Sequence, residues 1–167
     1  CVDRCDYHIG AKGRGSMNGL YLFARIAGTA VAISTDEVDA VVRLRELSAI
    51  PGVASHIAGL SALRSRVLTI IDAAALVLGQ KSSCTLLEDS DEECHAVVCE
   101  IGGHGYGILV DRVDDIQTVE TPPVPICGRI DPVWQSYATG VIETNGEPYF
   151  LISLAGFLDS CFSAQAA

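Results

Sequence analysis

The chain has 167 residues, enough for one domain with a sizeable core. Hydrophobic residues make up 49% and charged residues 19% of it, a composition typical of globular rather than disordered proteins. A formal net charge of −10, from 21 acidic and 11 basic residues, opposes binding to phosphate backbones and anionic lipids. We therefore expect no nucleic-acid partner and no direct membrane contact.

No segment has the length of a membrane span. The most apolar stretch, residues 67–79, is short and interrupted by Asp72, whereas a spanning helix needs about 20 apolar residues. The N-terminus shows no apolar core of a signal peptide after its basic residues. The expected location is cytoplasmic.

Residues 1–16 differ from the rest, with charges, glycines and two cysteines but no hydrophobic period. We treat them as a foreign or disordered tail outside the fold, and residues 17–163 as a single domain. A lipid-modified Cys1 is the alternative for this tail.

The first half of the domain is rich in short strands. Asp36 or Thr35 is placed to cap a helical turn, Pro51-Gly52 marks a turn, and residues 73–78 form a helix ended by Gly79. Apolar runs bounded by turn residues predict strands over 20–26, 29–33, 38–42, 60–63 and 67–71.

The strand pattern returns after an acidic run, residues 88–93, which we interpret as an exposed loop. A proline-rich connection at 121–125 and a hairpin turn at Asn145-Gly146 divide this half, and a helix over 154–161 ends it. Strands are expected over 95–101, 106–110, 113–119, 137–143 and 148–152. Two strand-rich stretches favour two small β-barrels in one chain over a single large one.

The seven cysteines are odd in number and include no Cys-x-x-Cys pair, so we interpret them as reduced thiols. We expect no zinc site, because structural zinc sites usually have tightly paired ligands. The candidate ligands without such pairing are Cys84, Cys94, Cys99, His95 and His104.

No catalytic motif stands out, and we expect neither an enzyme nor a cofactor. The glycine cluster at 102–107 is followed by a strand-like run, not by a helix or a Gly-Lys-Ser/Thr motif, which favours a hairpin turn over a nucleotide loop. No Gly-x-Ser-x-Gly elbow accompanies the histidines.

Two segments resemble the CheW-domain family. Residues 59–72 are similar to its Gly-x-x-Asn-Leu-Arg-Gly-x-Val-x-Pro-Val-x-Asp segment, and residues 107–116 to its Gly-x-x-Val-Asp-x-Val-x-Glu-Val segment. Weaker matches, at 21–23, 38–42, Pro51 and 140–158, follow in the family's order.

The resemblance implies a mainly β fold of two interlocked five-stranded, SH3-like β-barrels with short helices. It also implies a non-catalytic chemotaxis adaptor that binds two partners: the regulatory domain of a CheA-type histidine kinase and the cytoplasmic tip of a methyl-accepting chemoreceptor. An adaptor of a non-motility pathway, or a small ligand-binding or hydrolytic β-barrel, are the alternatives.

Carried over by position, Arg64 matches the family's receptor-binding arginine. The family's apolar positions beside it and in the second motif fall on four valines: Val38, Val41, Val110 and Val113. For Arg64 the alternative is a hairpin-tip arginine that serves solubility, and for the valines it is ordinary core packing.

Four positions depart from the family pattern: Ala40 replaces glutamate, Ala62 asparagine, Ser65 glycine and Thr69 proline. Ser65 is expected to be strained if its turn requires a positive φ. The two alanines remove polar groups near the expected receptor site, which predicts an altered receptor partner.

Overall fold

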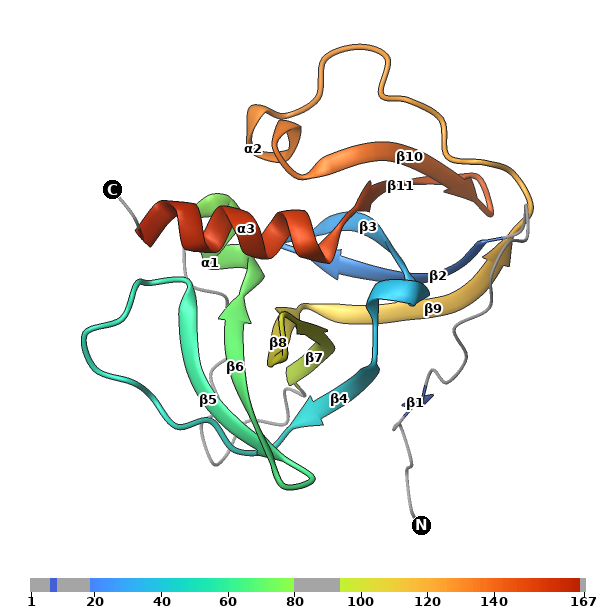
Figure 1. Ribbon diagram of the computed structural model, residues 1–167. Coiled ribbons are helices and arrows are strands. Elements are labelled where there is room, and N and C mark those ends of the chain that lie inside the picture. Colours follow the sequence, from blue (N-terminus) through green and yellow to red (C-terminus); the bar gives the residue numbers. More distant parts are fainter. Residues whose placement is uncertain (1–6, 9–18, 80–93, 166–167) are drawn as a thin grey trace.

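Figure 1 shows the computed structural model, which describes residues 7–8, 19–79 and 94–165; the acidic run at 88–93 and Cys84 lie outside them. Its strands form two sheets. The first has the order β1-β4-β7-β8-β6-β5: β1 (Tyr7–His8), β4 (Ala40–Leu44), β5 (Ile57–Leu63), β6 (Arg66–Asp72), β7 (Cys94–Ile101) and β8 (His104–Val110). The second has the order β10-β11-β3-β2-β9: β2 (Gly19–Ile26), β3 (Thr29–Ser34), β9 (Arg112–Val119), β10 (Ala138–Thr144) and β11 (Glu147–Ile152).

The two sheets are interlocked along the chain. The second sheet takes β2 and β3, the chain then builds β4 to β8 of the first sheet, and it returns with β9 to β11. Each sheet contains one parallel pair, β6 with β8 and β11 with β3, and its other pairs are antiparallel. The expected fold of two interlocked five-stranded units is confirmed. Residues 1–16 were expected to lie outside the fold, but two of them form strand β1, which adds a sixth strand beside β4.

The described residues also form four helices: η1 (Thr35–Glu37), α1 (Ala73–Leu78), α2 (Pro132–Gln135) and α3 (Leu154–Gln165). Helix η1 connects β3 of the second sheet to β4 of the first. Helix α1 has the bounds that the sequence predicted, because the Asp72 carboxylate accepts a hydrogen bond from the Ala75 N–H at 3.1 Å and Gly79 ends the helix at φ 68°. Helix α3 extends beyond the expected 154–161 and packs between the two sheets (Figure 1).

The main hydrophobic core lies between the two sheets. Strand β2 places Leu22, Ala24 and Ile26 in it, and α3 adds Phe157 and Leu158. Smaller clusters fill the other face of each sheet. The clusters are centred on Leu68, Ile70, Ala96 and Leu109 in the first sheet, and on Phe23, Ala32 and Ile142 in the second. Since successive strand residues point to opposite faces, strands buried on both faces have continuous apolar runs such as residues 96–99.

Asp111 fixes the point where the chain leaves the first sheet for the second. It sits between β8 and β9; its N–H donates to the Arg25 carbonyl oxygen at 2.8 Å, and its carboxylate accepts from the Gly28 N–H at 2.8 Å. Both bonds join the β8–β9 corner to the end of β2. The role of Asp111 is therefore structural: it holds the corner between the two sheets in place.

Candidate partner-binding site

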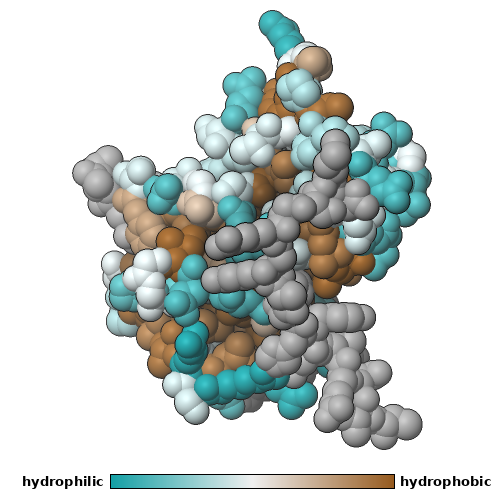
Figure 2. Space-filling model, turned by 45° about the vertical axis from the view of Figure 1, so that its right-hand side comes forward, coloured by the Kyte–Doolittle hydropathy of each residue, from teal (hydrophilic) through white to brown (hydrophobic). Residues whose placement is uncertain are grey.

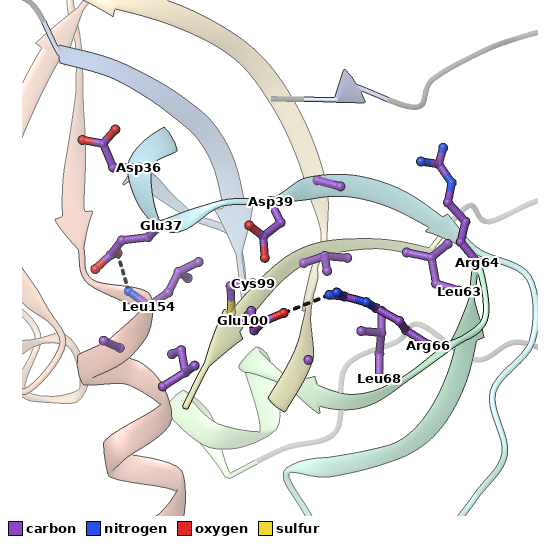
Figure 3. A pocket seen from close by; sticks show the side chains of 15 residues that line it. Asp36, Glu37, Asp39, Leu63, Arg64, Arg66, Leu68, Cys99, Glu100 and Leu154 are labelled. Atoms are coloured by element: carbon purple, nitrogen blue, oxygen red, sulfur yellow. Dashed lines mark hydrogen bonds and ion pairs between the residues drawn. The ribbon is translucent and has the colours of Figure 1, made fainter. Parts of the chain in front are cut away.

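A groove of about 720 Å³ opens between the first sheet and the start of α3. Its walls come from η1 and the start of β4, from the β5–β6 hairpin, from β7, and from Leu154 and Ala155. Figure 3 shows Asp36, Glu37 and Asp39 on one side of this groove and Arg64 on the other, with Arg66 reaching across to Glu100. The groove is polarised, with carboxylates along one wall and guanidinium groups at the opposite rim.

Glu37 holds the acidic wall against α3. Its Oε1 accepts from the Ser153 hydroxyl and its Oε2 from the Leu154 N–H, both at 2.8 Å. The second bond satisfies a donor at the N-terminus of α3, which a carboxylate also stabilises through the helix dipole. Glu37 thus ties the linker between the sheets to the helix that packs between them.

The opposite rim is a two-residue hairpin turn at Arg64-Ser65. Leu63 pairs with Arg66, and both turn residues are left-handed, with φ 47° at Arg64 and φ 70° at Ser65. Hairpins of this kind favour Asn-Gly or Gly-Gly, because both central residues need a positive φ. The turn does require a positive φ, so the expected strain at Ser65, where the family has glycine, is present.

An ion pair crosses the groove next to this turn. Arg66 Nη1 lies 2.8 Å from Glu100 Oε2, and both side chains are exposed. Exposed pairs of this kind contribute little to stability, typically well under about 1 kcal/mol. A partner that enters the groove can therefore displace Arg66 at small cost.

Apolar side chains lie between the charged walls. Leu63 and Ile101, both partly buried, form the accessible apolar floor together with exposed Ala155. Leu68, Leu154 and Cys99 also line the groove but are at most 2% exposed. Burial, followed by the nearby carboxylates of Asp39 and Glu37, raises the pKa of the Cys99 thiol to about 12. Cys99 therefore stays protonated near neutral pH and acts as a small apolar side chain, not as a nucleophile.

The five residues predicted from the sequence fall into two groups. Arg64 is exposed and lines the groove. Val38, Val41 and Val110 are at most 4% exposed and belong to the core between the sheets, and Val113 packs partly buried against that core. The arrangement favours core packing for the three buried valines, since a partner cannot touch them in this conformation.

Most residues of the groove were not predicted from the sequence. Glu37 bonds to residues more than a hundred positions away, and Glu100 meets Arg66 only because β7, β8 and β6 are neighbours in the sheet. One signal was present: Ala40, noted as a departure from the family near the expected receptor site, does line the groove. Ala62, the second such departure, is exposed on β5 outside the lining.

The cysteines require one correction. Cys94 is disulfide-bonded, so the interpretation of all seven as reduced thiols is wrong for this residue. Within the described chain Cys99, Cys127 and Cys161 are free. The described residues contain no group of three or more His, Cys, Asp or Glu side chains arranged to hold a metal.

On the face shown in Figure 2, hydrophobic side chains gather in patches bordered by hydrophilic ones. The exposed large apolar residues are scattered over several elements; Val67, beside the hairpin turn, is 65% exposed. Within the described residues no helix is long and apolar enough to cross a bilayer. A groove with an apolar floor and charged walls suits a protein segment as its occupant.

Comparison with known proteins identifies the family of the chain. Residues 20–162 match the CheW-like domain. The chain belongs to the CheW-like domain family. A CheW-like domain is a non-catalytic scaffolding adaptor.

Among solved structures, the scaffolding protein TtCheW from Thermoanaerobacter tengcongensis is similar to this chain, with a TM-score of 0.64 and 21% identity. The similarity covers 81% of this chain and 89% of that chain. At this identity the likeness concerns the fold. No protein with a curated description matches the chain.

Proposed function

We propose that this CheW-like domain couples methyl-accepting chemoreceptors to a CheA-type histidine kinase in the cytoplasm. The observation that carries the proposal is the groove beside Arg64, which joins an apolar floor to an arginine-bearing rim. A helical receptor tip presents an apolar stripe flanked by polar side chains, and such a helix fits a groove of this kind. The kinase regulatory domain is the second partner.

Arg64 is the proposed centre of the receptor contact. A guanidinium forms bidentate, charge-assisted hydrogen bonds with carboxylates, so an acidic residue of the receptor is its expected partner. The carboxylates on the far wall, Asp36 and Asp39, favour a basic residue at the other end of the same segment. Val113, partly exposed on β9, stays a secondary candidate outside the groove.

The test is binding of a receptor cytoplasmic-tip fragment, from the organism that encodes this chain, measured by calorimetry. Arg64→Ala is expected to weaken binding by roughly tenfold or more, because a charge-assisted contact contributes about 1.5–3 kcal/mol. Arg129→Ala, at an exposed arginine outside the groove lining, is the matched control and should bind as the wild type does. Equal affinities of the two variants would remove Arg64 from the contact.

A CheW-like adaptor also fits a pathway other than motility. The departures at Ala40, in the groove, and at Ala62 favour a receptor with a different polar pattern from the family's usual one. Deleting the gene and scoring swimming behaviour separates these outcomes. Normal chemotaxis in the deletion strain would assign the adaptor to another signalling pathway.

A further inference from the structure

Arg66 is held across the groove by a carboxylate of the same chain. Its Nη1 lies 2.8 Å from Glu100 Oε2, and the two side chains are 74% and 46% exposed. Arg66 lies on β6 and Glu100 on β7, two strands that are separated by β8. Figure 3 shows the guanidinium group of Arg66 directed toward Glu100, whereas Arg64 points another way. The ion pair therefore spans surface that a partner in the groove would cover.

Strand β8 leaves the path between these two side chains open. The β8 residue opposite Glu100 is Gly105, which also lines the groove. A Cβ at this position would lie 2.6 Å from Leu68 Cδ2, so a side chain fits there only if Leu68 moves. Because Gly105 has no side chain, the guanidinium group of Arg66 can lie across β8 and reach Glu100.

Arg66 and Arg64 belong to the same rim of the groove. The hairpin turn places them on either side of Ser65, and pairing with Leu63 fixes the backbone of Arg66 at the start of β6. An acidic side chain that reaches Arg64 therefore comes near Arg66 as well. A guanidinium group binds carboxylates strongly, but a second carboxylate beside Glu100 is repelled by its like charge. A partner carboxylate and Glu100 thus compete for Arg66.

We propose that Glu100 is an internal competitor for Arg66: it binds this arginine in the empty groove and is replaced by an acidic residue of the bound receptor segment. The inference rests on the proposed function and adds a second arginine to the contact at Arg64. Exposed ion pairs are weak, so a partner carboxylate can replace Glu100 at small cost. The competition favours acidic partners, because a neutral residue leaves Arg66 bound to Glu100.

A double-mutant cycle tests the competition through calorimetric binding of the receptor cytoplasmic-tip fragment. Salt of about 0.15 M screens exposed charges farther apart than roughly 8 Å. Glu100→Gln should bind roughly twofold to fivefold more tightly than the wild type, the range that an exposed ion pair supports. Glu143→Gln is the matched control, because Glu143 is also exposed but lies outside the groove lining. Arg66→Ala should bind several-fold more weakly, and adding Glu100→Gln to it should give no further gain.

An unchanged affinity of Glu100→Gln overturns the proposal while leaving the proposed function intact. An equal gain from Glu100→Gln with and without Arg66 also overturns it, because the effect is then general charge repulsion. If the wild type binds no fragment, the proposed function fails and the competition with it.

NMR of the Arg66 side chain tests the ion pair on the free full chain, without any partner. The Nε–Hε resonance of Arg66 should shift in Glu100→Gln and stay in place in Glu143→Gln. An unchanged resonance in Glu100→Gln would show that Glu100 does not hold Arg66 in solution, which overturns the proposal whether or not the fragment binds.

Discussion

Replacing Ser65 by glycine should stabilise the protein. Ser65 has φ 70° in an exposed turn, and a left-handed residue with a side chain costs roughly 1–2 kcal/mol. Glycine removes that cost, but its greater backbone freedom stabilises the unfolded chain by up to about 1 kcal/mol. The expected net gain in the free energy of unfolding is about 0.5–1 kcal/mol, which for a chain of this size raises Tm by roughly 1–4 °C.

Urea unfolding followed by the fluorescence of Trp134 measures this gain, because Trp134 is the single tryptophan and is buried. Ser136→Gly is the matched control: Ser136 is also exposed, but its φ of −79° suits any residue, so glycine should leave it unchanged or less stable. An unfolding midpoint of Ser65→Gly equal to or below that of the wild type would show that the left-handed conformation of Ser65 carries no cost. The same gain in both glycine variants would show that the effect is not specific to this turn.

Three further predictions follow from single contacts. Asp111→Ala should destabilise the protein by about 1 kcal/mol in urea unfolding, because the carboxylate that accepts from the Gly28 N–H is lost; wild-type stability would contradict the role of this corner. Glu37→Ala should lower the free energy of unfolding by about 1–2 kcal/mol, because the carboxylate that caps α3 is lost. Glu37→Gln should lower it by less, and equal losses in the two variants would show that hydrogen bonding at this cap does not matter. At pH 8 iodoacetamide should label exposed Cys127 but not Cys99 until the protein unfolds, as read by mass spectrometry. Since the folded pKa of Cys99 is raised from 9.0 to about 12, its contribution to stability is present below pH 9 and is lost as the pH rises toward 12.

Local elements could be predicted from the sequence because their signals lie within a few residues. The helix Ala73–Leu78 has a capping aspartate before it and a glycine after it, and the hairpins at 64–65 and 145–146 have their turn residues between two apolar runs. The family resemblance supplied the interlocked architecture that those local signals leave open.

The groove could not be predicted, because its parts meet only through long-range pairing. The parallel pairing of β6 with β8 brings Arg66 near Glu100, and the hydrogen bonds of Glu37 span most of the chain. The predicted valines were misleading for a different reason. In the sequence, an apolar residue in a strand buried on both faces cannot be told from an apolar residue on a binding surface. Val41 is assigned to the core only by its 3% exposure.

The proposed function requires this chain to bind a kinase and a receptor at the same time. The most direct test is a heteronuclear NMR titration of the full chain, first with the regulatory domain of its organism's CheA kinase and then with the receptor cytoplasmic tip. We expect saturable shifts for both partners, with those of the receptor tip around Arg64 and the groove, and with the kinase still bound when the tip is added. Absence of shifts with the kinase domain, or displacement of that domain by the receptor tip, would contradict the proposed function.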